Sequence, residues 1–571
     1  MDRFWLRQYP PGVPHDIDPH EASSLKELLE RACERYADRI AYRSMGTAIT
    51  YRELERQSRA FGAWLQQRAG LKRGDRIAIM LPNLLQYPIA MIGALRAGLV
   101  VVNTNPLYTP PELEHQLSDS GATGILVLEN FAHVVEKVLP RTSLKRVLVT
   151  AVGDLLGFPK SAIVNFVVRH VRKQVPAWNI PAAVSFKAVL TQGKKLPLAP
   201  VDIGPNDLAF LQYTGGTTGV AKGAMLSHGN ISTNVLQSEA WLGTRFAEYE
   251  NGGVLITAIP LYHIFALTGN CMVFLRLGWK NVLIINPRDV PAFIKDLQKH
   301  PPNYISGVNT LFNALLHAPG FERIDFSGLK TALGGGMAVQ AAVAQRWKEA
   351  TGHVLTQAWG LTETSPGACI NPSDLDFNGS IGLPIPSTEI AIKDDAGNDL
   401  ALGQIGEICV RGPQVMRGYW KRPDETAKVM LPDGWLRTGD VGHMDGQGFV
   451  YIEDRKKDMI LVSGFNVYPN EVEAVAVNCP GILEAAAVAQ PDEHSGEVVA
   501  LFVVRRDPSL TEQDVMDCCR KSLAGYKVPK HVYFRNDLPK SNVGKILRKA
   551  LRQELEPMSN PENTEGRVNS R

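Results

Sequence analysis

Short apolar runs alternate with amphipathic stretches along the first 350 residues of the chain. The runs RIAIML (76–81) and GILVL (124–128) have the length of buried strands, whereas residues 21–37 and 50–69 repeat apolar positions every three or four residues, as one helix face does. The same alternation recurs at 303–316 and 330–352. Strands that alternate with helices predict an α/β fold, in which helices cover parallel sheets.

The pattern changes after about residue 380 to short strands broken by Gly and Pro, as in GEICVRGPQVMRGYW (406–420), which predicts a β-rich subdomain. Five consecutive charges at 454–458 then separate two apolar runs, and we expect them to lie outside any strand core. They mark a predicted boundary between a large N-terminal domain (1–455) and a small, mobile C-terminal α+β domain (456–556), followed by a disordered tail (557–571).

Within the C-terminal domain the pattern predicts a helix from Pro469, strands near 484–491 and 498–506, and a helix from Thr511. These elements alternate over about a hundred residues. They are enough for a compact module with a core of its own.

The composition describes a soluble globular protein. The 571 residues are 44% hydrophobic with a net charge of +3, and no run of about 18 apolar residues predicts a membrane span. The N-terminus lacks the apolar core of a signal peptide, so we expect a cytoplasmic protein, and the small net charge gives no indication of a nucleic-acid partner. Seven cysteines without a CxxC pair predict reduced thiols rather than disulfides or zinc ligands.

One stretch departs from this even charge. Residues 155–201 contain no Asp or Glu, whereas Arg169, Arg172 and Lys173 lie to one side of a helical pattern that includes Ile163 and Phe166. Two interpretations stay open: a helix that lies on a membrane surface, and a helix that packs on the core with a solvated basic rim.

The segment YTGGTTGVAKGA (213–224) concentrates four glycines, three threonines and one lysine. Glycine lets backbone N–H groups approach an anion closely, and hydroxyl and ammonium groups add further donors. The segment therefore predicts a phosphate-binding loop, although it lacks the Gly-Lys-Ser/Thr ending of a Walker motif. Its candidate binding residues are Thr214, Gly215, Gly216, Thr217, Thr218, Gly219 and Lys222.

Two further segments offer nucleotide contacts. LGGGMAV (333–339) follows an apolar run and predicts a close-approach loop at a strand end. QAWGLTETSP (357–366) sets the flat ring of Trp359 beside Thr362 and Glu363, a hydroxyl and a carboxylate suited to a phosphate-bound magnesium ion.

Three single residues are ambiguous on their own. Asp440 ends WLRTGD, where it suits the hydroxyls of a ribose or caps a turn. His263 lies in the apolar run PLYHIFAL, where a buried structural histidine is the default interpretation. Lys545, in LPKSNVGKILRKAL, taken alone is a surface charge.

Taken in order, these segments resemble the adenylate-forming (ANL) superfamily of acyl-CoA synthetases, adenylation domains and luciferases. The resemblance covers nearly all of residues 25–555 and is strongest to bacterial long-chain fatty-acyl-CoA ligases, in PLYHIFALTGN, GVNTLFNALL, DRKKDMILVSGFNVYPNEVE, GYKVPK and LPKSNVGKILR. It implies a Mg²⁺-dependent ligase that joins a fatty acid to CoA through an acyl-adenylate formed from ATP. The basic stretch at 155–201 motivates a further hypothesis, peripheral association with the inner face of the membrane, because a long-chain acid partitions into bilayers. The sequence does not define the oligomeric state, and a homodimer is possible.

The resemblance implies a role for each matching residue. Thr214 and Glu363 match the magnesium-associated pair, and Gly335, Gly336 and Trp359, with Gly360 and Thr362 beside them, match the adenine pocket. Asp440 and Arg455 match the ribose-binding acid and its basic partner, Lys457 the hinge, Lys545 the adenylation lysine, His263 a histidine near the acyl carboxylate, and Gly464 the loop that admits CoA.

Two departures limit the transfer of roles. Many relatives have tyrosine at the position of Trp359, so we expect stacking without the contacts of a phenolic hydroxyl. A gating tryptophan of some thermophilic long-chain ligases would fall at Leu267, so that gate is not expected here.

Three other functions stay open: an acyl-AMP ligase that charges a carrier protein, a ligase for medium-chain or aryl acids, and a non-catalytic fatty-acid binding or uptake protein. The presence of every expected catalytic residue type argues against the last. The sequence does not define the acyl chain length, because a tunnel of scattered apolar residues would set it.

Overall fold

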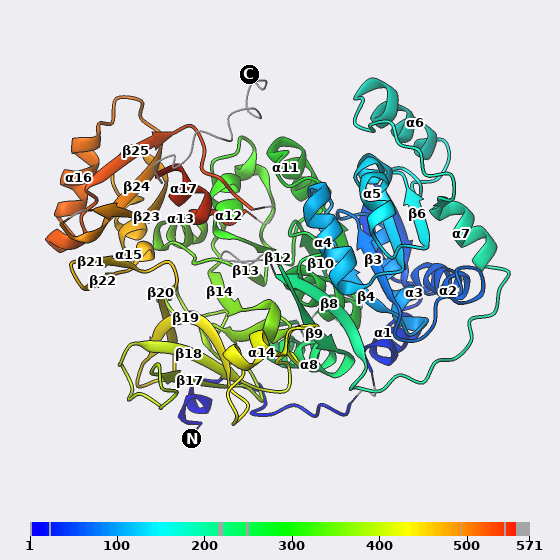
Figure 1. Ribbon diagram of the computed structural model, residues 1–571, viewed down its shortest axis with the longest axis horizontal. Helices are drawn as coiled ribbons and strands as arrows, with labels where there is room; N and C mark the ends of the chain where they lie inside the picture. Colours follow the sequence, from blue (N-terminus) through cyan, green and yellow to red (C-terminus); the bar gives the residue numbers. More distant parts are fainter. Residues whose placement is uncertain are drawn as a thin grey trace.

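The computed structural model describes residues 3–21, 24–214, 221–246, 249, 252–492, 494–541 and 544–555. Two large sheets with helical cover form the N-terminal domain, together with a smaller antiparallel sheet, and a separate sheet forms the C-terminal domain (Figure 1). The predicted α/β fold class is confirmed. The phosphate-loop residues 215–220 and the predicted tail from 557 lie outside the described residues.

A seven-stranded sheet has the order β7 (Val184–Ser185), β6 (Arg146–Thr150), β5 (Gly124–Leu128), β3 (Arg76–Met80), β4 (Val100–Asn103), β8 (Leu208–Thr214) and β9 (Lys222–Ser227). Successive side chains of a strand point to opposite faces, so Ile77 and Ile79 pack on one side of the sheet and Ala78 and Met80 on the other. The apolar run at 76–81 is therefore buried on both faces.

A nine-stranded sheet has the order β16 (Leu383–Pro384), β15 (Gly367–Ile370), β14 (Leu355–Gly360), β13 (Thr331–Gly334), β12 (Tyr304–Gly307), β10 (Val254–Thr257), β11 (Lys280–Leu283), β1 (Ile40–Ser44) and β2 (Thr47–Thr50). The prediction of parallel sheets holds for the centres only, because β8–β9, β1–β2, β14–β15 and β15–β16 pair antiparallel. Short direct connections join consecutive strands at these edges, and such connections require antiparallel pairing.

Helices cover both large sheets. In chain order they are α1 (Leu25–Arg35), α2 (Tyr51–Gln67), α3 (Gln86–Arg96), α4 (Pro110–Ser120), α5 (Ala132–Val138), α6 (Lys160–Phe166), α7 (Phe186–Gly193), α8 (His228–Phe246), α9 (Ile264–Ala266), α10 (Val273–Arg276), α11 (Val290–Lys299), α12 (Asn309–Leu316) and α13 (Ala341–Thr351). Their starts follow capping chemistry: the side chains of Ser24 and Thr50 accept the backbone N–H groups of Glu27 and Glu53.

The chain then enters an antiparallel sheet of β17 (Glu389–Lys393), β18 (Gly406–Arg411), β19 (Leu436–Met444) and β20 (Val450–Arg455), with α14 (Pro423–Val429) between β18 and β19. The C-terminal sheet contains β22 (Phe465–Val467), β21 (Ile460–Val462), β24 (Gly496–Arg505), β23 (Ile482–Asp492) and β25 (His531–Arg535). Its helices are α15 (Pro469–Ala476), α16 (Glu512–Arg520) and α17 (Arg548–Leu555), so the elements predicted from Pro469 and Thr511 are confirmed.

The expectation that the charged run at 454–458 avoids strand cores is wrong for Asp454. This residue lies within β20 and is completely buried. Its carboxylate accepts the backbone N–H groups of Arg455 and Asn470 and an N–H of the Arg548 guanidinium, which together compensate the lost hydration. Burial nevertheless raises the pKa of Asp454 to about 6.

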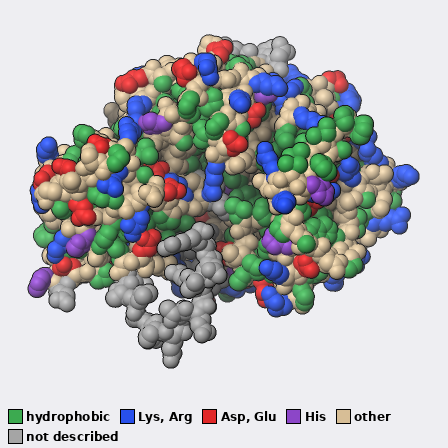
Figure 2. All heavy atoms as spheres, turned by 90° about the horizontal axis from the view of Figure 1, so that it is seen from above, with side chains coloured by type: hydrophobic (Ala, Val, Ile, Leu, Met, Phe, Trp, Pro, Cys, Tyr) green, Lys and Arg blue, Asp and Glu red, His purple; other side chains and the backbone are tan. Residues whose placement is uncertain are grey.

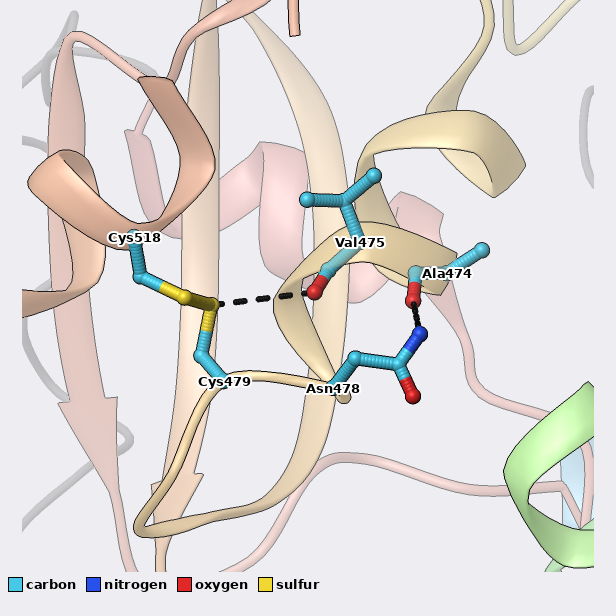
Figure 3. Close-up of a disulfide and its surroundings, with 5 residues drawn as sticks. All are labelled: Ala474, Val475, Asn478, Cys479 and Cys518. Carbon is cyan, nitrogen blue, oxygen red and sulfur yellow. Dashed lines mark hydrogen bonds between the residues drawn. A yellow bond between two sulfur atoms is a disulfide. The ribbon is translucent and has the colours of Figure 1, made fainter. Parts of the chain in front are cut away.

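The expectation of reduced thiols is wrong for one pair. Cys479, which follows α15, forms a disulfide with Cys518 of α16, and their Cα atoms lie 6.0 Å apart (Figure 3). The two helices pack together, which brings cysteines 39 positions apart in sequence within bonding geometry. The other five cysteines are free and buried.

Candidate active site

The loop that carries Lys545 lies against the strand ends of the nine-stranded sheet. The hydroxyl of Thr310, in α12, donates to the carbonyl of Gly544 at 3.2 Å. Gly336 follows β13 with a φ of +78°, and a Cβ built there would lie 3.6 Å from Cε of Lys545. The C-terminal domain therefore presents its lysine directly to the glycine loop predicted from LGGGMAV.

Asp440 is held from two sides. Its Oδ2 accepts the indole N–H of Trp359 at 2.9 Å, and its Oδ1 pairs with Arg455, the residue opposite it on β20. The carboxylate is only 2% exposed, and these two donors compensate its burial. Asp440 is thus no simple turn cap: Trp359, expected only to stack, also orients the acid.

Lys545 is the cation at the centre of this cluster. Burial, together with the positive charges of Arg455 and Lys457, lowers its pKa to about 8, although Asp440 and Glu363 oppose the shift. The residues that act on its charge come from β20, the following turn, β19 and the segment after β14. The structure therefore brings five of the residues predicted from sequence into one electrostatic site.

His263 is a neutral hydrogen-bond donor in this site. Burial, and then the charge of Lys545, lowers its pKa to about 3, so the ring carries no charge near neutral pH. Its Nδ1 accepts the backbone N–H of Phe265 at 3.3 Å, which places the ring proton on Nε2. An Nε2–H group next to a lysine can donate to a carboxylate bound between them.

Two buried amides fix the loop that carries His263, and sequence reasoning missed both. Asn83 accepts the N–H of Leu261 at 2.8 Å and donates to the carbonyl of Ile259 at 3.1 Å. Gln212, on β8, donates to the carbonyl of Tyr262 at 2.8 Å. Both partners lie in other parts of the chain, so no local spacing could have revealed them.

Glu363 lies in the 3-10 turn η7 (Thr362–Thr364), which packs against β8 and β9. Its Oε1 accepts the hydroxyl of Tyr419 at 2.7 Å, and Oε2 accepts no hydrogen bond from the described part of the chain. Tyr419 was also missed, because a tyrosine in a Gly-Tyr-Trp sequence carries no functional signal by itself. The turn that carries Glu363 packs against β8, the strand that ends at Thr214, and a carboxylate and a hydroxyl are the kind of hard oxygen donors that Mg²⁺ prefers.

Lys222 is engaged elsewhere in this structure. Its ammonium group pairs with Glu425 of α14 and lies 5.2 Å from the centroid of the Tyr419 ring. Lys222 lies opposite Thr214 in the β8–β9 ladder.

Two predicted glycines have clear steric reasons. A Cβ on Gly360 would lie 1.8 Å from the carbonyl of Pro366, and one on Gly335 would lie 3.1 Å from that of Ala358. Gly464 is different: it forms the exposed hairpin turn between β21 and β22, and no heavy atom lies within 4 Å of a Cβ built there. Lys457 occupies the turn after β20, where its carbonyl accepts an N–H of Arg552 at 3.3 Å.

This fold and this cluster define an adenylate-forming enzyme. The AMP-binding enzyme family matches residues 29–420, and the AMP-binding enzyme C-terminal domain matches residues 471–545; the chain belongs to this family. It is 54% identical, over 97% of its length and 98% of the relative, to a long-chain-fatty-acid–CoA ligase from Escherichia coli O157:H7.

Two solved structures resemble the chain along nearly its whole length. The anthranilate CoA ligase AuaEII in complex with anthranoyl-AMP has a TM-score of 0.83 at 23% identity and covers 94% of this chain and 99% of its own, a likeness of fold alone. ATP-bound MatB from Rhodopseudomonas palustris has a TM-score of 0.75 at 28% identity and covers 93% of this chain and 99% of its own.

Proposed function

We propose that this chain is a long-chain fatty acid–CoA ligase. The fatty carboxylate attacks the α-phosphorus of ATP and releases diphosphate, and the thiol of CoA then attacks the acyl carbonyl of the adenylate and releases AMP. The observation that carries the proposal is the full-length, 54% identity to a protein of that name. Two anions must meet in the first step, so catalysis depends mainly on positioning and charge neutralisation.

The cluster around Lys545 suits the first step. The ammonium group of Lys545 bridges the attacking carboxylate and the α-phosphate, and the Nε2–H of neutral His263 donates to the acyl carboxylate. Asp440, oriented by Trp359 and Arg455, accepts the ribose hydroxyls. Gly335 and Gly336 allow the adenine ring to approach the backbone, with Gly360 and Thr362 at the edge of the pocket.

Residues of the phosphate loop complete the site. The segment 214–219 and Lys222 bind the β- and γ-phosphates, for which Lys222 exchanges Glu425 for the anion. Glu363 and Thr214 would hold Mg²⁺, which supplies charge neutralisation of the phosphates. Among the described residues there is no cluster of three or more His, Cys, Asp or Glu side chains suited to a metal.

The second step needs a different arrangement. Lys457 acts as the hinge about which the C-terminal domain, residues 456–556, rotates after adenylation. The rotation withdraws Lys545 and brings the Gly464 hairpin to the site, where a residue without a side chain lets pantetheine pass. The exposed position of Gly464 in the present arrangement agrees with a role in the other one.

A panel of acids tests this function. Purified protein with MgATP and CoA should release AMP with long-chain acids and form the acyl-CoA in equal amount. AMP release that is highest with medium-chain or aryl acids would show that these acids, rather than long-chain acids, are the substrates. Acyl transfer to a carrier protein in preference to CoA would favour an acyl-AMP ligase. No acid-dependent AMP release would leave only a binding or uptake role.

We also propose that the enzyme works at the inner face of the membrane, because long-chain acids partition into bilayers. In the described part of the chain no helix is long and apolar enough to cross one, so the association would be peripheral. Sedimentation of the protein with phospholipid vesicles tests this association.

A further inference from the structure

Four large apolar side chains are exposed together at one end of the N-terminal domain. Phe158, Ile163, Phe166 and Val171 are 92, 59, 59 and 65% exposed, and no other stretch of 14 residues in the described chain holds four such side chains. Phe158 precedes α6, Ile163 and Phe166 lie in it, and Val171 ends its π-helical continuation η4 (Val167–Val171). This helix lies outside β6, at the edge of the molecule (Figure 1). We call residues 158–173 the arm.

The exposure argues against one of the two interpretations of this helix, packing on the core. A helix packed on the core would bury Ile163 and Phe166 and expose its basic rim, whereas the arm buries only Ser161 and Val168. Exposed apolar clusters are unfavourable in water and mark surfaces that bind a partner.

The charge around the arm is positive. Arg172 and Lys173 are exposed at its end, and Lys187 lines, with Phe158 and Phe166, an open cavity of about 560 Å³. Two acids lie nearby: Glu129 is 4% exposed and its charge is paired with Arg169, whereas the negatively charged Asp154 lines the same cavity. The three positive charges of Arg172, Lys173 and Lys187 outnumber this single negative one. Hydrophobic and basic side chains accordingly lie interspersed at this end of the molecule, at the right of Figure 2.

We infer that the arm docks on a bilayer that contains anionic phospholipid. Its four apolar side chains enter the boundary between headgroups and acyl chains, while Arg172, Lys173 and Lys187 face the anionic headgroups. The inference rests on the proposed membrane association and names the surface responsible. A bilayer matches the combination of apolar tips and surrounding cations better than a protein partner, whose contact surface would need paired acids in register.

Arg169 is excluded from the docking charges. Its guanidinium donates to both carboxylate oxygens of Glu129, at 3.0 Å and 2.6 Å, so replacing it would leave a buried acid unpaired. A test that neutralised Arg169 would confuse docking with stability.

Vesicle co-sedimentation tests the inference with two double variants. Ile163→Ser with Phe166→Ser should lower partitioning about tenfold or more on phosphatidylcholine vesicles that contain phosphatidylglycerol. Arg172→Gln with Lys173→Gln should lower it roughly fivefold per charge on those vesicles and leave weak binding to pure phosphatidylcholine unchanged. The matched control, Leu402→Ser with Ile405→Ser, changes two exposed apolar residues in the β17–β18 connection and should have no effect.

The outcomes separate the two proposals. Wild-type protein that stays in the supernatant would reject membrane association itself. Wild-type protein that sediments together with equally bound arm variants would place the docking surface elsewhere, and a protein contaminant needed for sedimentation would overturn the lipid partner. The ligase rate with a soluble, shorter acid should be the same in all variants, because none of the residues touches the site.

A label gives a readout that does not depend on weakened binding. All five free cysteines are buried, so Val171→Cys can be labelled selectively with a polarity-sensitive fluorophore. Its emission should shift to shorter wavelength on anionic vesicles, whereas the same label at Leu402→Cys should not respond. An unchanged Val171→Cys signal on vesicles that bind the protein would contradict docking through the arm.

Discussion

Arg548 donates to Asp454 at 3.2 Å, and this contact connects the start of α17 with the end of strand β20. Arg548 stands three residues after Lys545, and its guanidinium also donates to Glu473 and to Asn470 of α15. The carboxylates around it raise the pKa of Arg548, so it stays charged although it is largely buried. Arg548 therefore holds the segment that carries Lys545 against β20, the strand that also contains Arg455.

Replacing Arg548 should loosen this anchor. Arg548→Gln leaves Asp454 and Glu473 buried without their cation, which costs roughly 3–5 kcal/mol in the free energy of unfolding. The matched control is Arg520→Gln, which removes an exposed pair with Asp517 and should cost at most about 1 kcal/mol. Equal decreases in melting temperature in the two variants would show that Arg548 stabilises the fold no more than an exposed arginine does.

The same variant should also separate the two half-reactions. A displaced Lys545 slows acyl-adenylate formation, whereas supplied acyl-adenylate and CoA should react at nearly the wild-type rate. Diphosphate release and thioester formation, measured below the melting temperature of the variant, check this. Equal loss in both steps would indicate a global defect.

The sequence predicts the elements better than the contacts between them. The strand at 76–81 and the helix from Pro469 follow from local pattern, because burial on a sheet face and capping chemistry are local properties. Asp440, Lys545 and His263 were ambiguous singly, and only their order along the chain gave them roles. Asn83, Gln212 and Tyr419 carry no pattern at all, because each acts through a hydrogen bond to a distant segment.

The disulfide and the burial of Asp454 are two features that the sequence predicted wrongly. Cysteine counting favoured free thiols, but the packing of α15 on α16 decides whether Cys479 can reach Cys518. Charge counting placed Asp454 outside a strand core, but the partner that permits its burial, Arg548, lies 94 residues later. Both errors arise where tertiary contact overrides a local rule.

The pKa of Lys545 should appear in the pH profile of adenylation. In the enzyme without substrate, Lys545 is protonated below about pH 8 and loses its charge above that pH. The value of kcat/KM should therefore fall up to tenfold per pH unit on the alkaline side. His263, with its pKa near 3, should add no acidic limb between pH 5 and 8. ATP–diphosphate exchange at low substrate concentration measures this profile.

Lys545→Arg is the control for that profile. Arginine keeps its charge across the range, so the descending limb near pH 8 should disappear even if the rate is lower. A limb that stays at the same pH in this variant would assign the titration to another group.

Gly464 should matter to thioester formation only. Gly464 has a φ of +85° in an exposed turn with no heavy atom within 4 Å of a built Cβ, so a larger residue meets strain but no clash in this arrangement. Gly464→Leu should leave acyl-adenylate formation nearly intact and block transfer to CoA. Gly403→Leu, also at positive φ in an open turn, is the control for backbone strain. Equal loss of both steps would reject the role in CoA entry.

Lys545 gives the sharpest test of the proposed mechanism. The present arrangement places its ammonium group beside Gly336, Asp440 and His263, where it offsets repulsion between carboxylate and phosphate in a site that excludes water. Removing one preorganised charge of this kind commonly costs ~3–4 kcal/mol, about two to three orders of magnitude in rate. Lys545→Ala should therefore nearly abolish adenylation. The variant should still convert supplied acyl-adenylate and CoA to thioester, because in the proposed mechanism the second step proceeds with the lysine withdrawn. The control is Lys549→Ala, which changes an exposed neighbour on α17 and should keep both acyl-adenylate formation and thioester formation. Adenylation by Lys545→Ala at the wild-type rate would remove this residue from the reaction and, with it, the main support for a rotating C-terminal domain.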